Sequence, residues 1–199
     1  MDKKQQIAKS ESFLSRHRAP PLLFLPNVWD CLSARLFVAA GFDAIATTSG
    51  GVAWALGYPD GERAPWPEVV AATARIVRSA QVPVTADIEA GYGQTPAEVA
   101  MHVTEIIATG VVGINLEDGF GGSIRSIDDA SDRLRAAREA ANKAGVPIVI
   151  NARCDFFHLK NFEEKCDFRR RSTDAKPIWP LALIVFTPLA YAIRRSLPR

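Results

Sequence analysis

Clusters of charged, small polar and glycine residues follow successive strand-like apolar runs along the chain. Each cluster contains groups that could bind an ion or a small molecule. Side chains that follow parallel strands gather at one edge of a sheet, where such folds carry out their chemistry. The position of an active site can therefore be predicted before its reaction. The four clusters are Thr48–Gly51, Asp87–Gly93, Asn115–Asp118 and Asn151–Arg153.

Four carboxylates in or near these clusters could bind a metal ion. Asp87 and Glu89 lie two residues apart at the end of an apolar run, so in a strand both side chains would point to the same face. Glu117 ends the next run, and Asp60 lies in the loop after the preceding run. Converging carboxylates repel one another unless a cation joins them, and oxygen ligands alone select a hard ion. We therefore expect Mg²⁺ or Mn²⁺ here.

The elements that must position these clusters alternate between strand-like and helical patterns. Strands are expected to begin near Leu22, Ala44, Pro83, Val112 and Pro147. A (β/α) barrel and an open doubly wound sheet both fit this α/β alternation. A Rossmann fold is disfavoured because no Gly-x-Gly-x-x-Gly motif lies at a strand-to-helix turn. The helices predicted between the strands are Trp29–Ala40, Pro67–Ala80, Thr95–Thr109 and Asp128–Lys143.

Composition limits the class of protein. The chain has 199 residues, of which 48% are apolar, enough for one domain with a hydrophobic core. A net charge of +2 gives no indication of nucleic-acid binding. The charged segment 1–18 lacks the apolar stretch of a signal peptide, and three cysteines without metal-like spacing indicate reduced thiols. We expect a cytoplasmic protein with a small-molecule partner and no nucleic-acid partner, compatible with a homo-oligomer.

Six segments carry a resemblance to a known family, and they occur in the family's order and spacing. They are Leu25–Asp30, Ser49–Gly51, Gly57–Glu62, Asp87–Gly93, Glu117-Asp118 and Asn151–Arg153. From about Leu22 to Asp155, the chain resembles the isocitrate lyase/phosphoenolpyruvate mutase superfamily. The resemblance implies a TIM-type (β/α) barrel. It also implies a metal-dependent enzyme that makes or breaks a C–C or C–P bond next to a 2-oxo acid, or its phosphonate analogue, through a metal-stabilised enolate.

The resemblance also implies roles for the acidic residues. Asp87 would be the direct metal ligand, with Glu89 as the second residue of the metal pair. Asp60 and Glu117 would be catalytic carboxylates that act largely through water. The alternative for each is a solvated loop acid.

Basic and neutral residues would bind the substrate. Arg153 would hold a developing enolate oxygen or a carboxylate, because a planar guanidinium suits both. The backbone N–H groups of the Ser49-Gly50-Gly51 turn would bind the substrate carboxylate. Asn151 shares the face of Arg153 and would support the site, and the family places an aromatic residue, here Trp29, near the substrate. A surface ion pair is the alternative for Arg153, and a flexible turn is the alternative for Ser49–Gly51.

One departure from the family lies after the fourth strand. Members that cleave isocitrate or methylisocitrate carry a Lys-(Lys/Arg)-Cys-Gly-His loop there, with the cysteine as catalytic acid. In this chain the stretch is Gly119–Arg125, which has no thiol. An isocitrate-type lyase is therefore disfavoured, although this glycine-rich loop could act as a lid with Ser123 or Arg125 reaching the substrate.

A second departure is the C-terminal part of the chain. A complete barrel needs about 250 residues, and the strand–helix alternation stops near Phe157. We expect an N-terminal helical segment over 1–19, an incomplete barrel of about five βα units over 20–157, and an atypical tail outside the barrel over 158–199. The apolar part of that tail, Ile178–Ile193, is interrupted by prolines and is too short for a membrane helix. The alternatives to an enzyme are an inactive barrel fragment and a module tethered by this tail.

Overall fold

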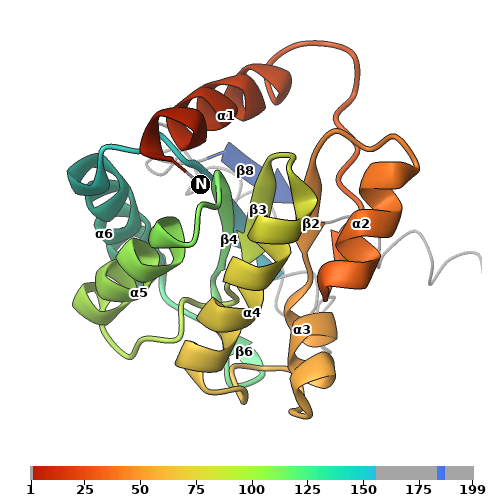
Figure 1. Ribbon diagram of the computed structural model, residues 1–199. Coiled ribbons are helices and arrows are strands. Elements are labelled where there is room, and N and C mark those ends of the chain that lie inside the picture. Colours follow the sequence, from red (N-terminus) through yellow and green to blue (C-terminus); the bar gives the residue numbers. More distant parts are fainter. Residues whose placement is uncertain (1, 156–182, 187–199) are drawn as a thin grey trace, which may run out of the picture.

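The computed structural model describes residues 2–155 and 183–186 of the protein. In these residues, parallel strands alternate with helices to form an α/β fold (Figure 1). The helices are α1 (Lys3–Arg16), α2 (Cys31–Ala39), α3 (Ser49–Leu56), α4 (Trp66–Ala80), α5 (Pro96–Ala108) and α6 (Ile127–Ala144). The strands are β1 (Asn27–Val28), β2 (Ile45–Thr47), β3 (Val84–Asp87), β4 (Gly113–Glu117), β5 (Gly119–Phe120), β6 (Ser123–Ile124), β7 (Val149–Cys154) and β8 (Leu183–Phe186).

The main sheet has the order β1-β2-β3-β4-β7-β8, and all of its neighbouring strands are parallel. Sequential strands therefore lie side by side, with a helix between most pairs, as in a (β/α) barrel. Among the described residues the sheet does not close, because β1 and β8 are its two edges. β5 and β6 form a separate antiparallel hairpin after β4.

Local sequence explains where the helices begin and end. Asp30 caps α2 and Thr95 caps α5, each through a reciprocal capping box, and the box at α5 uses Glu98. Gly145 ends α6 in the left-handed conformation, with φ 65°. The four helices predicted from periodicity are confirmed, with boundaries that differ by up to two residues.

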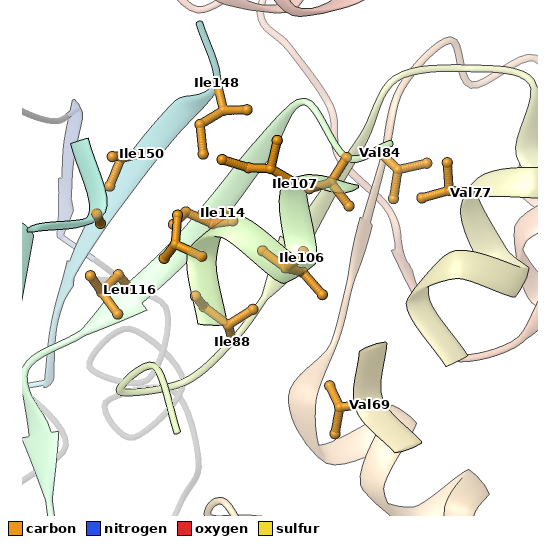
Figure 2. Close-up of a cluster of buried hydrophobic side chains, with 14 of the residues drawn as sticks. Val69, Val77, Val84, Ile88, Ile106, Ile107, Ile114, Leu116, Ile148 and Ile150 are labelled. Atoms are coloured by element: carbon orange, nitrogen blue, oxygen red, sulfur yellow. The ribbon is translucent and has the colours of Figure 1, made fainter. Parts of the chain in front are cut away.

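The two faces of the sheet differ sharply. The face toward α4, α5 and α6 is apolar, and Ile88, Ile106 and Ile114 are fully buried in it (Figure 2). Because side chains alternate along a strand, the intervening residues point to the other, inner face. Apart from Gly113 and Val149, which lie at the starts of β4 and β7, those residues of β3, β4 and β7 are polar. They are Thr85, Asp87, Asn115, Glu117, Asn151 and Arg153.

Two segments are placed differently from the sequence-based expectation. The Ser49-Gly50-Gly51 segment was expected to be a turn, but it is the first turn of α3. The tail 158–199 was expected to lie outside the barrel, but Leu183–Phe186 forms β8 and pairs with β7. The sequence shows the apolar run that contains this segment, but its pairing could not be predicted because strand pairing depends on a distant partner. The rest of the expected tail, like the end of the barrel domain at 156–157, lies outside the described residues. In the part of the chain that the structure describes, no helix combines the length and apolar character needed to cross a membrane.

Candidate active site

Asp87, Glu117 and Arg153 meet at the carboxyl ends of β3, β4 and β7. Strand register places them together, since Asp87 pairs with Asn115 and Glu117 pairs with Arg153. The Arg153 Nη1 atom lies 2.5 Å from Glu117 Oε1 and 3.8 Å from Asp87 Oδ2. Both carboxylate side chains are only 9% exposed, while Arg153 is 26% exposed. This arrangement brings together three of the residues that the sequence predicted as functional.

Asp155 holds the Arg153 guanidinium from the other side. Arg153 Nε donates to Asp155 Oδ1 at 2.7 Å and Nη2 donates to Oδ2 at 3.2 Å, a bidentate pair. The Asp155 N–H in turn donates to Asp118 Oδ1 at 2.7 Å. A Cβ atom on Gly119 would lie 2.6 Å from Asp155 Oδ2, so a larger residue there would displace the Asp155 carboxylate. The orientation of Arg153 is thus fixed by contacts with the protein.

The site contains more acidic groups than basic groups. Three carboxylates, those of Asp87, Glu117 and Asp155, contact one guanidinium. Burial and, to a smaller extent, the nearby Asp87 charge together raise the pKa of Glu117 to about 10. Burial likewise raises the pKa of Asp87, although Arg153 and the N–H and hydroxyl groups of Ser49 oppose that shift. Burial alone would lower the pKa of Arg153, but the surrounding carboxylates raise it.

A divalent cation fits this excess of acidic groups, because a bound cation favours their ionised form. Mg²⁺ typically binds one or two protein carboxylates and keeps several waters, and Asp87 with Glu117 could supply those carboxylates. Within residues 2–155 and 183–186, no three histidine, cysteine, aspartate or glutamate side chains form a preformed metal cluster. The residues present therefore suit a hard ion that takes its remaining oxygen ligands from water or substrate, rather than an ion held only by protein.

Glu89, which the sequence predicted to share the face of Asp87, lies beyond the end of the strand. β3 ends at Asp87, and Glu89 has a positive φ of 51°, so strand alternation does not extend to it. Its buried carboxylate instead accepts hydrogen bonds from the Glu62 N–H at 2.9 Å and the Tyr92 hydroxyl at 2.9 Å. Burial raises the pKa of Glu89, and the charges of Asp60 and Glu62 add to the rise. Glu89 thus organises the loops beside the site.

The first turn of α3 lies beside Asp87 and gathers the predicted substrate-binding residues. Thr48 precedes the helix without making a side-chain cap, so the N–H groups that follow Ser49 in this turn could donate to an anion. The N–H and hydroxyl of Ser49 interact with Asp87. A Cβ atom on Gly50 would lie 3.1 Å from Asp60 Oδ2, and one on Gly51 would lie 2.9 Å from Trp29 Cβ. Exposed Asp60 and Trp29 therefore flank this turn.

Asn151 lies one layer below the charged residues. Its Nδ2 donates to Asn115 Oδ1 at 2.8 Å, and the two residues are register partners on β7 and β4. The buried Asn151 Oδ1 has no hydrogen-bond partner among the described residues. Both amides line a cavity of about 660 Å³ that extends toward the segment after α1. Asn151 thus supports the site from beneath, in a position that leaves one acceptor open.

Some residues of the site were missed at the level of sequence. Asp155 fixes Arg153, Asn115 pairs with Asn151, and the Thr47 hydroxyl accepts a hydrogen bond from the Asp87 N–H at 2.9 Å. The period of two along a strand could have identified the first two, because each lies two residues from a predicted site residue on the same strand end. Nothing local marks Thr47, whose partner is forty positions away.

The chain is similar to proteins of known family. The phosphoenolpyruvate phosphomutase family model matches residues 13–173. An uncharacterized protein of Mycobacterium tuberculosis is 38% identical over 150 residues, covering 75% of this chain and 55% of that protein. The 2-methylisocitrate lyase of Escherichia coli K12 is 33% identical over 140 residues, covering 65% of this chain and 47% of the lyase. The chain thus spans about half the length of these curated relatives.

Solved structures agree with the sequence comparison. The crystal structure of a candidate phosphonomutase from Burkholderia cenocepacia J2315 superposes with a TM-score of 0.83 at 38% identity, covering 97% of this chain and 81% of that one. The family-model match over residues 13–173 includes the strands that carry Asp87, Glu117 and Arg153. The chain belongs to the phosphoenolpyruvate phosphomutase family, within the isocitrate lyase/phosphoenolpyruvate mutase superfamily of TIM-barrel proteins.

Proposed function

We propose that this chain carries a Mg²⁺- or Mn²⁺-dependent lyase or mutase site. It would act on a 2-oxo acid or its phosphonate analogue and break or form a C–C or C–P bond. One observation carries the proposal: three carboxylates surround a single guanidinium at the carboxyl edge of the sheet, two of them nearly buried. A divalent cation and an anionic substrate together would balance such a site. Family membership supports the same class of chemistry.

Asp87 would hold the cation directly, with Glu117 beside it and Glu89 and Asp60 supporting from the adjoining loops. The bound cation would supply Lewis-acid stabilisation of negative charge on substrate oxygens. The N–H groups at the start of α3 would bind the substrate carboxylate, because a helix N-terminus favours anions. Arg153, held in place by Asp155, would stabilise negative charge that develops on an oxygen during reaction.

The sequence of the loop after β4 disfavours reactions that need a cysteine as the catalytic acid. Gly119–Arg125 forms the β5–β6 hairpin, and its sequence contains no cysteine that could act as an acid. The reactions that fit need only a stabilised enolate: decarboxylation, phosphonate hydrolysis or transfer, and retro-aldol cleavage with a different acid. The similarity to a phosphonomutase candidate and to a 2-methylisocitrate lyase leaves both bond types within the proposed range.

Mg²⁺-dependent thermal stabilisation tests the cation site. A ligand that binds only the folded state raises its stability, so Mg²⁺ should raise the melting temperature of the wild-type protein. Asp87→Ala should abolish that rise, whereas Asp132→Ala on the exposed face of α6 should retain it. An undiminished Mg²⁺ response in Asp87→Ala would contradict the assignment of Asp87.

Product formation tests the reaction. A lactate dehydrogenase-coupled assay for pyruvate covers oxaloacetate, phosphonopyruvate and substituted malates in one screen. Arg153→Met should lower turnover of any active substrate by roughly 10²- to 10³-fold, as expected for losing a group that stabilises developing charge. No turnover on the whole panel by folded protein that binds Mg²⁺ would favour the inactive-fragment alternative over an enzyme.

A further inference from the structure

Arg133 on α6 is a buried cation outside the charged cluster. The residue is 1% exposed, although its helix otherwise presents a polar, basic-rich face. Its Nη1 donates to the Gly93 carbonyl at 2.9 Å and its Nη2 donates to the Gln94 carbonyl at 2.6 Å. Its Nε donates to Asp129 Oδ1 at 3.0 Å. A buried guanidinium is costly unless it is fully hydrogen-bonded, so this set of contacts must persist for the residue to stay buried.

The two carbonyls belong to the loop that follows β3. This loop is closely packed, because a Cβ atom on Gly93 would lie 2.8 Å from the Val99 backbone nitrogen. Tyr92, directly before the anchored carbonyls, has a φ of 57°, a conformation that a bulky residue adopts only when its surroundings impose it. Arg133 therefore fixes the far end of a loop whose near end begins at Asp87.

Tyr92 connects the anchored end of the loop to residues beside the site. Its hydroxyl donates to Glu89 Oε1 at 2.9 Å, and its N–H donates to Glu62 Oε1 at 2.6 Å. The Glu89 N–H in turn donates to Asp87 Oδ1 at 3.2 Å. A short series of contacts thus runs from Arg133 through the loop to the carboxylate proposed to hold the cation.

Asp129 extends the same network to the β5–β6 hairpin. Its Oδ2 accepts from Arg125 Nη1 at 2.9 Å, while its Oδ1 accepts from Arg133. Arg125 follows β6, and its backbone N–H closes the hairpin by donating to the Asp118 carbonyl at 2.8 Å. The Arg125 guanidinium is thus directed toward α6, and one carboxylate joins the cations that anchor two separate loops.

We propose that Arg133 is a positioning residue that couples the loop after β3 (88–94) to the β5–β6 hairpin segment (119–125). Through Asp129, both loops are held against α6 as one unit beside Asp87 and Glu117. The inference that this unit positions a cation and its substrate rests on the proposed function. The coupling of the two loops is independent of the proposed function.

Amide hydrogen exchange measures the coupling without any ligand. Arg133→Lys keeps the charge but cannot reach two carbonyls and Asp129 at once, so exchange in both 88–94 and 119–125 should become about 10-fold faster, on the order of a 1.4 kcal/mol loss of protection. Arg135→Lys, an exposed substitution on the same helix, should leave both segments unchanged. Asp129→Asn, which removes only the shared carboxylate, should accelerate 119–125. If Arg133→Lys unfolds the protein, Asp129→Asn alone decides, and an unchanged hairpin in that variant overturns the coupling.

The Mg²⁺ concentration that gives half of the thermal stabilisation measures positioning. A residue that only stabilises the fold would lower the melting temperature and leave this concentration unchanged. Arg133→Lys should raise it about 10-fold, and Arg135→Lys should not change it. If wild type responds to Mg²⁺ but Arg133→Lys has the wild-type half-saturation, the positioning role is wrong and the proposed function stands. If wild type shows no response to Mg²⁺, the proposed function fails and hydrogen exchange alone decides the coupling.

Discussion

The strand ends of the main sheet differ in how their polar groups are paired. We call the side where the parallel strands begin the amino edge and the side where they end the carboxyl edge. At the amino edge, α1 lies across the ends where strands begin (Figure 1), and it contacts the junction before each of four strands. Gln6 Nε2 donates to the Ile107 and Val111 carbonyls, both at 2.8 Å, ahead of β4. Ser10 donates to the Pro147 carbonyl at 2.6 Å ahead of β7. Lys9 donates to the Gln81 carbonyl at 2.9 Å ahead of β3, and Arg16 pairs with Asp43 ahead of β2.

At the carboxyl edge, acidic and basic groups are not matched in number. There Asp87, Glu117 and Asp155 contact one guanidinium, and burial raises the pKa of the first two carboxyls. At the amino edge, buried polar groups are neutral and paired with backbone carbonyls, which favours stability. At the carboxyl edge, three carboxyl groups surround one guanidinium, so acidic groups remain that could hold a bound cation. The comparison indicates that the amino edge of the sheet contributes mainly to stability and that the carboxyl edge carries the candidate site, as is typical of barrels.

The largest expected effect is at the amino edge. Phe13 is 1% exposed and packs with Ala44, Val112 and Val149 beneath the strands. Phe13→Ala should lower the free energy of unfolding by about 3 to 5 kcal/mol, because it removes a buried ring and leaves a cavity. Urea denaturation measures the loss, and Phe24→Ala, at a side chain that is largely exposed, is the control. A loss below 1 kcal/mol would show that α1 does not close this edge.

The next effect should have the opposite sign and lies at the carboxyl edge. The folded pKa of Glu117 is raised from 4.5 to about 10, so the folded state binds more protons than the unfolded state between these values. The stability of metal-free wild type should therefore be fully present below about 4.5 and fall as pH rises toward about 10. In EDTA at neutral pH, Glu117→Gln should be more stable than wild type by on the order of 2 to 3 kcal/mol.

Urea denaturation across that pH range checks the sign. The falling slope should be weaker in Glu117→Gln and unchanged in Glu139→Gln, at an exposed position of α6. A Glu117→Gln variant that is less stable than wild type without metal would mean that Arg153 already balances the site, and the two edges would then be alike.

The smallest effect returns to the amino edge. Gln6→Leu keeps the side-chain size but leaves the Ile107 and Val111 carbonyls without their donor. Loss of a donor to buried carbonyls should cost about 2 kcal/mol. Gln5→Leu, at the exposed neighbouring position, should change stability by less than about 0.5 kcal/mol. Equal effects at Gln5 and Gln6 would mean that water replaces the amide and that the amino edge is not sealed by α1.

The sequence by itself determined the alternation of strands and helices and the edge at which the site lies. Apolar periodicity and caps such as the Thr95–Glu98 box act over a few residues, so they can be recognised locally. The same locality explains why Asp87, Glu117 and Arg153 were correctly predicted to lie close together. Each ends its own strand, and parallel pairing brings strand ends to one edge.

Only the tertiary structure decided how the remaining groups are used. Glu89 contacts Glu62 and Tyr92, and it lies two residues beyond the end of β3, where strand alternation no longer applies. Arg133 is buried, although the sequence of its helix predicts a solvent-exposed basic face. Its burial could not be predicted locally, because its carbonyl partners lie about forty residues away. Gln6 and its acceptors are more than one hundred residues apart. Contacts over such separations depend on how whole elements pack, and a local pattern carries no information about that packing.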